Sequence, residues 1–70
     1  MAAMRIYVND FEMEVPHETT ISRLLNIMEE SYTVDMIVEI NHRFVHTKEY
    51  DSIVLAEDDR IDIIHLDMGG

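Results

Sequence analysis

The sequence has no cysteine, no tryptophan, one proline and two glycines among its 70 residues. Without cysteine, the chain cannot form a disulfide bond, a thiolate zinc site or a thiol nucleophile. Its apolar runs are a few residues long, far short of the roughly 20 residues that span a bilayer. The first residues lack the charged start and apolar stretch of a signal peptide, and Ala2 stands where myristoylation requires a glycine. We therefore expect a cytoplasmic protein.

Positive charge is also scarce. The chain has 5 Lys and Arg against 15 Asp and Glu, which gives a net charge of −10 at pH 7. Such a surface repels phosphate backbones and anionic lipid headgroups, so we expect no binding to nucleic acid or to membranes. The charge favours solubility, and it can also steer the protein toward a basic partner surface. A hydrophobic content of 47% is ordinary for a globular chain, and the lack of repeats and linkers predicts one domain, residues 1–70.

Motifs for catalysis and for binding metal ions or cofactors are missing as well. The sequence has no glycine-rich phosphate loop and no recognisable arrangement of serine with histidine or lysine. His42 and His46 are four residues apart, but on a turn and a short strand this spacing does not align imidazoles as it would on a helix. His17 and His65 are distant in the sequence. Two carboxylate pairs are interpreted as solvated turn and helix-end residues: Asp58-Asp59 and Glu29-Glu30. We expect no enzyme activity, no cofactor and no metal site.

The residues from Met4 to Val15 alternate in hydrophobicity with period two, except at Asn9-Asp10. This pattern predicts two strands joined by a turn at that pair, a hairpin that opens the domain. Pro16 cannot donate a hydrogen bond to a neighbouring strand, so the second strand should end there. Glu12 and Glu14 should face water. The inward-facing residues would be Ile6, Val8, Met13 and Val15.

An amphipathic helix should follow over Ile21 to Glu30. Thr19-Thr20 provides an N-cap for it. Four apolar residues fall at helical spacing on one stripe: Ile21, Leu24, Leu25 and Met28. The acidic residues at the C-terminal end oppose the helix dipole mildly, so we expect that end to fray.

The second half of the chain predicts five segments in order: a strand (Val34–Ile40), a turn (Asn41-His42), a short strand (Arg43–Val45), an irregular segment (Lys48–Leu55) and a final strand (Arg60–Asp67). A polar turn, Glu57-Asp58-Asp59, precedes the final strand, and the irregular segment has three inward anchors: Tyr50, Ile53 and Leu55. One helix over one apolar face of a mixed sheet of about four or five strands makes a two-layer α+β domain. With the final strand in the centre, this is the ubiquitin-like β-grasp arrangement. The expected core is Ile6, Val8, Leu24, Leu25, Met28, Val38, Ile40, Ile61 and Ile63.

The end of the chain carries the most informative pattern. Ile64, Leu66 and Met68 have the parity opposite to that of the core residues, so we expect them on the open face of the sheet as a partner-docking surface. The sequence ends in Gly69-Gly70. Because glycine has no Cβ, such a flexible tail places the main-chain carboxylate on a thin stalk that fits narrow channels. This shape suits a carboxylate that another enzyme activates.

Several short motifs occur in order along the chain: Thr20-x-x-x-Leu24-Leu25, Val38-Glu39-Ile40-Asn41, Val45, Tyr50, Leu55-Ala56-Glu57-Asp58-Asp59-Arg60-Ile61 and the Gly-Gly end. In this order, the whole length resembles the sulfur carriers of thiamine biosynthesis, the ThiS family. Two positions depart from the family, because Asp58 and His42 stand where glycines are common. Aspartate tolerates the left-handed conformation at modest cost, so the last turn can differ in type without affecting the tail.

The resemblance implies a sulfur carrier. An adenylating, ThiF-like enzyme would join the Gly70 carboxylate to AMP, using ATP. Sulfur from a donor system, relayed as a persulfide, would then displace AMP and leave a thiocarboxylate on Gly70. A ThiG-like synthase would use this sulfur to build the thiazole ring of thiamine, and Gly69 would let the tail reach both active sites. The free carrier is expected to be a monomer that supplies no acid, base or metal ligand of its own.

Two other functions remain open from the sequence. The small subunit of molybdopterin synthase is a related carrier, although such chains are usually longer and tend to have a proline-containing segment where this chain has Leu66-Asp67-Met68. A ubiquitin-like modifier or interaction module would instead be joined through Gly70 to lysine side chains. A Gly-Gly end fits all three functions.

Overall fold

The computed structural model describes residues 2–29 and 36–66, and the expected strand start at Val34 and the residues from Asp67 to Gly70 lie outside this range. The described elements are β1 (Ala3–Val8), β2 (Phe11–Pro16), α1 (Ile21–Ile27), β3 (Met36–Ile40), β4 (Arg43–Val45), the 3₁₀ helix η1 (Thr47–Glu49) and β5 (Arg60–His65). No helix in these two ranges is long and apolar enough to cross a membrane.

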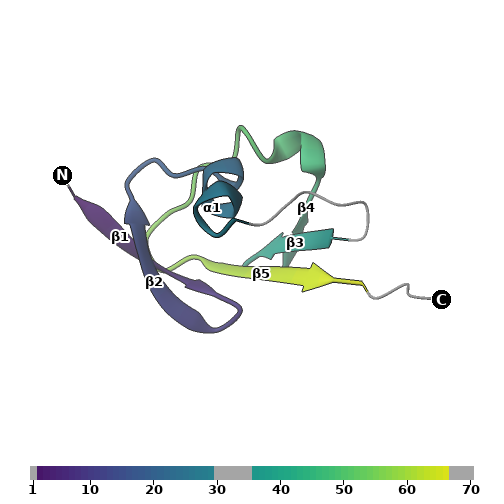
Figure 1. The fold of residues 1–70 in the computed structure, drawn as a ribbon, viewed down its shortest axis with the longest axis horizontal. Helices are drawn as coiled ribbons and strands as arrows, with labels where there is room; N and C mark the ends of the chain where they lie inside the picture. The colour runs from purple at the N-terminus through teal and green to yellow at the C-terminus, as the bar shows by residue number, and fades with distance from the viewer. Residues whose placement is uncertain (1, 30–35, 67–70) are drawn as a thin grey trace.

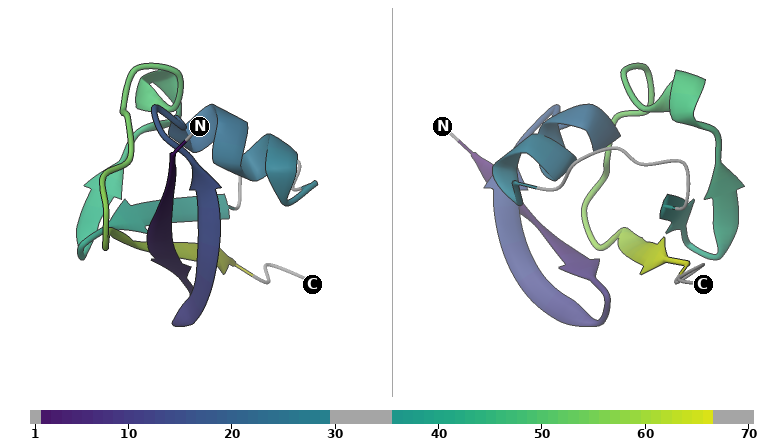
Figure 2. Two further views of the ribbon diagram at one scale, coloured as in Figure 1. Left: turned by 90° about the vertical axis from the view of Figure 1, so that its left-hand side faces the viewer. Right: turned by 45° about the vertical axis from the view of Figure 1, so that its right-hand side comes forward.

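The strands form one mixed sheet in the order β2-β1-β5-β3-β4, with the last strand of the chain in the centre. β5 runs parallel to β1 and antiparallel to β3, and the other two pairings are antiparallel. α1 lies across one face of this sheet (Figure 1), and Figure 2 shows the same layering from two other directions. This is the β-grasp topology that the sequence predicts. We call the face of the sheet that points away from α1 the open face.

The opening hairpin has the predicted turn. Asn9 and Asp10 have φ angles of 50° and 70°, the left-handed values that a two-residue hairpin turn requires to match the twist of its strands. Asparagine and aspartate tolerate this conformation better than most residues with a side chain. The apolar parity of both strands points toward α1, and Pro16 is the last residue of β2.

Thr20 caps α1 as predicted, and its hydroxyl accepts a hydrogen bond from the Arg23 N–H at 3.1 Å. The helix ends at Ile27, however, and not at the expected Glu30. The reason is local: Glu29 has a φ of 59°, which turns the chain out of the helix in the way a C-terminal glycine usually does. No basic residue stands in the last turn to complement the helix dipole, which favours this early end.

Two other turns place residues with side chains where the family resemblance would place glycine. His42, between β3 and β4, and Asp58, before β5, both have a φ of 69°. Both residues therefore adopt the left-handed conformation, which glycine takes without steric cost. Asp58 also ties its turn to β1, because its N–H donates to the Arg5 carbonyl at 2.7 Å and its carboxylate pairs with the Arg5 guanidinium at 3.1 Å.

The irregular segment after η1 packs beside the start of α1. Thr20 and Val54 form an isolated β-bridge that holds it there. Tyr50 and Leu55 are buried, as predicted for two of its anchors, whereas the third, Ile53, is half-buried.

The core lies between α1 and the sheet. Its buried hydrophobic residues are Met4, Ile6, Val8, Val15, Ile21, Leu24, Leu25, Met36, Val38, Val45, Tyr50, Leu55, Ile61 and Ile63. Two predicted core residues, Met28 and Ile40, are only half-buried and pack against its edge. Met28 is the cap that follows the last helical residue, and Ile40 is the last residue of β3, so neither is covered on all sides.

Leu25 is fully buried, with 0% of its surface exposed, so Leu25→Ala should lower the free energy of unfolding by about 2–5 kcal/mol. The truncation removes buried methyl groups and leaves a cavity, in a domain too small to have much stability to spare. Urea denaturation measures the loss. Ile27→Ala is the control on the same helix, since Ile27 is 43% exposed and should lose less than about 1 kcal/mol. Equal losses in the two variants would contradict this packing.

Candidate functional site

The described part of the predicted site is the end of β5 and the residue that follows it (Figure 1). Two of the predicted docking residues, Ile64 and Leu66, are 40% and 41% exposed, as expected for this surface. Met68 and the predicted sulfur-carrying residues Gly69 and Gly70 lie outside the described residues. The structure therefore describes the central strand that leads to these residues, together with the neighbouring strands.

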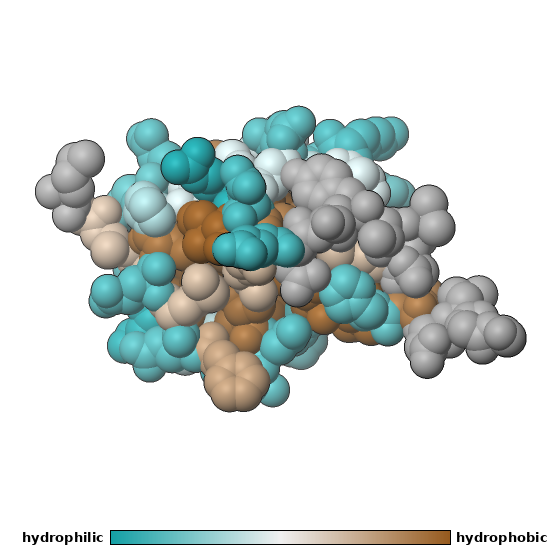
Figure 3. Space-filling view, in the orientation of Figure 1, coloured by the Kyte–Doolittle hydropathy of each residue, from teal (hydrophilic) through white to brown (hydrophobic). Residues whose placement is uncertain are grey.

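The central strand alternates between the two faces of the sheet. Ile61 and Ile63 are buried beneath α1, which confirms their predicted register, and Ile64 has the opposite parity. Ile64 lies opposite Ile37 of β3, which is half-buried. We call Ile37, Ile64 and Leu66 the apolar patch. Figure 3 shows hydrophobic surface along and at this end of β5.

Asn9 holds β5 in place just before the apolar patch. β1 and β5 pair directly at only two positions. Beyond these, the Asn9 side chain acts as an extension of β1: its Oδ1 accepts from the Ile63 N–H at 2.9 Å and its Nδ2 donates to the Ile63 carbonyl at 3.3 Å. The Asn9 N–H donates to the Ile61 carbonyl at 2.9 Å. Sequence reasoning identified Asn9 only as a turn residue, because a contact with a strand so far along the chain leaves no local signal.

The part of the open face nearest β1 carries two arginines, each paired with an aspartate: Arg5 with Asp58, and Arg60 with Asp10. The guanidinium carbons of Arg5 and Arg60 lie 5.9 Å and 4.8 Å from the centre of the Tyr7 ring, within range of cation–π attraction. The hydrogen bond from Arg5 to Asp58, together with the charges of Tyr7 and Asp58, raises the pKa of Arg5 above its ordinary value. Arg5 therefore stays charged at any physiological pH. The open face thus runs from two arginines over β1 to the apolar patch at the end of β5.

Between these two regions, three side chains that can bind a metal ion meet. Glu39 of β3 lies directly opposite Asp62 of β5, and His42 lies in the turn that follows β3. One ligand atom from each of the three lies within 4.8 Å of the other two. Sequence reasoning missed this cluster because it depends on the register between β3 and β5. The remaining histidines are exposed and lie on separate segments: His17, His46 and His65.

Of the two carboxylate pairs noted in the sequence, Asp58-Asp59 makes contacts that hold a turn. Asp58 is paired with Arg5, while Asp59 accepts hydrogen bonds from the Ala56 N–H at 2.8 Å and from the Asn41 side chain at 3.1 Å. Both aspartates therefore shape the turn before β5. Of the other pair, Glu29 is exposed after the helix end, and Glu30 lies outside the described residues.

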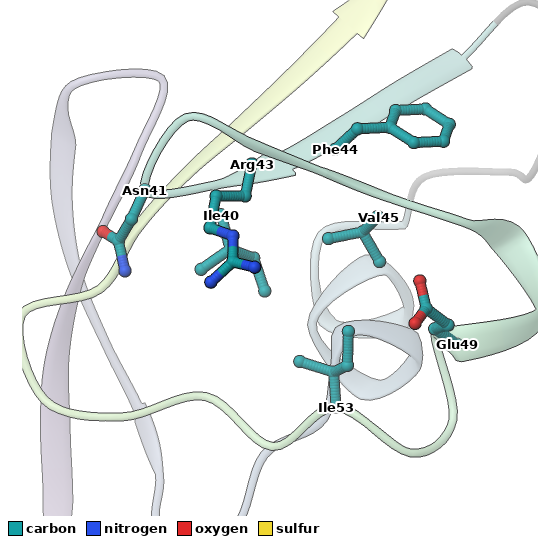
Figure 4. Close-up of a pocket in the computed structure, with 7 residues that line it drawn as sticks. All are labelled: Ile40, Asn41, Arg43, Phe44, Val45, Glu49 and Ile53. Atoms are coloured by element: carbon teal, nitrogen blue, oxygen red, sulfur yellow. The ribbon is translucent and has the colours of Figure 1, made fainter.

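A hollow of about 300 Å³ opens between the β3–β4 hairpin and the segment that carries η1 (Figure 4). Arg43 reaches into it from the hairpin, beside Ile40, and Glu49 and Ile53 line its other side. The Glu49 carboxylate accepts a hydrogen bond from the His46 N–H at 3.0 Å and so caps η1. Within this hollow there is no pairing of a nucleophile with a base.

Comparison with known proteins agrees with the fold. The model of the ThiS family matches residues 1–70. The crystal structure of the thiamine biosynthesis protein ThiS from Geobacter metallireducens is similar, with a TM-score of 0.79 and 20% identity, over 96% of this chain and 99% of that chain. A structure described as molecular mimicry of SUMO that promotes DNA repair has a TM-score of 0.47 and 13% identity, over 89% and 88%, too low to add to the argument. Curated proteins give no significant match. The first of these structures confirms the ubiquitin-like β-grasp fold.

Asn9→Gly tests whether the Asn9 side chain holds β5. Glycine adopts the φ of 50° at no steric cost, so the substitution keeps the turn and removes only the side chain. We expect the free energy of unfolding to fall by about 1–3 kcal/mol, because the Ile63 N–H loses its partner. The Ile63 amide should also exchange faster in hydrogen-exchange NMR.

Asp10→Gly is the matched control for this experiment. Asp10 has a φ of 70° in the same turn, and its one ion pair, with Arg60, is exposed and 3.5 Å long. This variant should be neutral or more stable than the wild type. Equal destabilisation by the two glycines would mean that the turn itself, and not the bond to Ile63, fixes β5.

Proposed function

The chain belongs to the ThiS family of sulfur carriers, and we propose that it carries sulfur for thiazole formation in thiamine biosynthesis. In this proposal, the reacting group is the main-chain carboxylate of Gly70, which is adenylated and then converted to a thiocarboxylate. The observation that carries the proposal is that the family match spans residues 1–70 and so includes Gly69-Gly70.

The chemistry needs an activated carboxylate. Attack of the Gly70 carboxylate on the α-phosphorus of ATP forms an acyl adenylate and releases pyrophosphate. A persulfide sulfur then attacks the acyl carbon, AMP leaves, and an acyl disulfide forms. A thiol then attacks the sulfur of this acyl disulfide that belongs to the donor, so that a new disulfide forms between the thiol and the donor and the S–S bond to the acyl sulfur breaks. The thiocarboxylate remains on Gly70. One carboxylate oxygen has been replaced by sulfur.

The chain need not be an enzyme for this chemistry, because partners can supply every catalytic step. Two side-chain contacts within residues 2–29 and 36–66 join separate segments of the fold: the Ser22 hydroxyl donates to the Asp51 carboxylate, and Arg5 pairs with Asp58. ATP binding and acid–base chemistry fall to a ThiF-like adenylating enzyme, sulfur supply to a donor system, and sulfur use to a ThiG-like synthase. A cytoplasmic location, where ATP is available, belongs to the same proposal.

The apolar patch, together with Met68, is the proposed docking surface. Gly70 follows Leu66 by four residues, so the intervening chain spans at most about 14 Å when fully extended. A partner that binds the patch would therefore keep the carboxylate within a short reach of its own active site, which raises the effective concentration of the reacting group. The net charge of −10 would speed association with a basic partner surface.

Adding one residue after Gly70, or deleting Gly70, should abolish adenylation and leave the thermal melt unchanged. The physical reason is that the reacting carboxylate is displaced or lost while the fold is untouched. The measurement is intact mass after incubation with ATP, a matching adenylating enzyme and a sulfur donor. The wild type, and a control with the same residue added before Met1, should gain the mass difference between sulfur and oxygen. Sulfur transfer by the extended chain would rule out the carrier function, and isopeptide adducts on lysine would favour a modifier.

Leu66→Asp should weaken binding to the adenylating enzyme and to the synthase by about tenfold or more, because it places a charge in the apolar patch. Leu66 is 41% exposed, so the variant should keep the wild-type melting temperature. Phe11→Asp is the matched control, since Phe11 is 77% exposed but lies opposite the buried Val8 in the β1–β2 pair and so has the parity of the other face of the sheet. Affinities can be measured by calorimetry. Equal affinities of wild type and Leu66→Asp would exclude the patch from docking.

A further inference from the structure

Three metal-ligating side chains converge on the open face where β3 leads into β4. Glu39 and Asp62 occupy directly opposed positions of the antiparallel β3–β5 pair. His42 follows Glu39 by three residues and lies in the β3–β4 turn. Their ligand atoms lie within 4.8 Å of one another. The sequence spacing of the histidines predicts no metal site, but the sheet register brings together residues that are far apart along the chain.

Two opposed carboxylates on one face of a sheet repel each other. Glu39 and Asp62 are both half-buried, so water screens their repulsion only in part. The ion pairs in the described part of the chain are Arg5–Asp58 and Arg60–Asp10, and neither involves these two carboxylates. The cluster thus has unbalanced negative charge that a bound cation would neutralise.

The nearest arginine of the hairpin does not supply that charge. Arg43 lies opposite Ile40 in the β3–β4 pair, whereas Glu39 lies opposite Phe44. Because neighbouring residues of a strand point to opposite faces, Arg43 and Glu39 lie on different sides of the sheet. In Figure 4 the Arg43 side chain lies beside Ile40 in the hollow.

The turn that carries His42 is fixed to β5. The Asn41 N–H donates to the Arg60 carbonyl at 2.7 Å, and the Asn41 side-chain oxygen accepts from the Arg60 N–H at 3.0 Å. Arg60 is two residues before Asp62 on the same strand. These two bonds hold the His42 backbone in register with the Asp62 backbone. The backbone that carries these two ligands is therefore already in place before an ion binds.

We propose that Glu39, His42 and Asp62 form a binding site for a divalent transition-metal ion, with Zn²⁺ as the best-matched ion. Zn²⁺ binds both imidazole nitrogen and carboxylate oxygen, and zinc sites with three protein ligands keep a fourth position open. Magnesium and calcium prefer oxygen ligands throughout, and a soft ion such as Cu(I) would require thiolates or thioethers. In a tetrahedral site the ligand atoms lie about 3.4 Å apart, and rotation of the exposed His42 side chain closes the remaining distance.

The site borders the apolar patch. Asp62 and Ile64 are alternate residues of β5, and Ile37 and Glu39 are alternate residues of β3, so all four lie on the open face. A bound ion would present its fourth position on the same face as the proposed docking surface. The site goes beyond sulfur carrying and does not depend on it.

Zn²⁺ titration of the full chain, after treatment with a chelator, tests the site by calorimetry and by NMR of the imidazole groups. We expect saturable one-to-one binding that shifts the His42 ring signals most. His42→Ala should weaken Zn²⁺ binding by more than about tenfold, since loss of even a residue that only supports a ligand costs about 10–100-fold. His46→Ala is the matched control, because the His46 ring lies 4.7 Å from the Phe44 ring, outside the cluster, and this variant should bind as the wild type does.

Asp62→Asn separates loss of the site from loss of the fold. Without metal, this variant should melt at a higher temperature than the wild type, because it removes the repulsion with Glu39. Zn²⁺ should raise the melting temperature of the wild type but not that of Asp62→Asn. Absence of saturable binding would overturn the proposal. The proposal would also be overturned if His42→Ala and His46→Ala weakened Zn²⁺ binding equally, or if neither weakened it. Either result would mean that Zn²⁺ is attracted diffusely to an acidic surface.

Discussion

The pairing of β5 with β1 and β3 is the interaction on which the rest of the structure depends. β5 is the last strand along the chain but lies in the centre of the sheet, so the two hairpins are joined only when it docks. One of its faces, with Ile61 and Ile63, completes the core, while Asp62 and Ile64 on the other build the open face. Its direct pairing with β1 is short, and the Asn9 side chain extends it. The same strand therefore completes the core and positions the described part of the candidate site.

Most of the fold could be predicted because its signals are local. Alternation on both sides of Asn9-Asp10 predicts the hairpin, and Thr20 before an apolar stripe predicts the helix start, both of which the structure confirms. The helix end was predicted wrongly because Glu29, a residue with no tendency to end helices, takes the left-handed position there. The half-burial of Met28 follows from the same early end.

Only the part of the candidate site that is continuous in sequence could be predicted. Gly69-Gly70, Ile64 and Leu66 follow from the order and parity of residues at one end of the chain. The pairing of Ile37 with Ile64 depends on the register between strands far apart in sequence, and so does that of Glu39 with Asp62. What the fold adds is an ordered surface that carries two paired arginines near β1, the carboxylates of Glu39 and Asp62 in the middle, and the apolar patch near the end of β5. Such a surface fits the docking role proposed for this face.

Seven residues in the described part of the chain have positive φ angles, and none of them is glycine. Several of these residues also make a contact beyond their own turn, since Asn9 bonds to β5, His42 belongs to the Glu39–Asp62 cluster, and Asp58 pairs with Arg5. The same residues therefore give the turns their backbone conformation and make side-chain contacts with other parts of the fold. Replacing Asn9, His42 or Asp58 with glycine would suit the positive φ angle but would remove the contact that the side chain makes. Turns usually accept mutation more readily than strands, but in this protein several of them should be among the least replaceable segments.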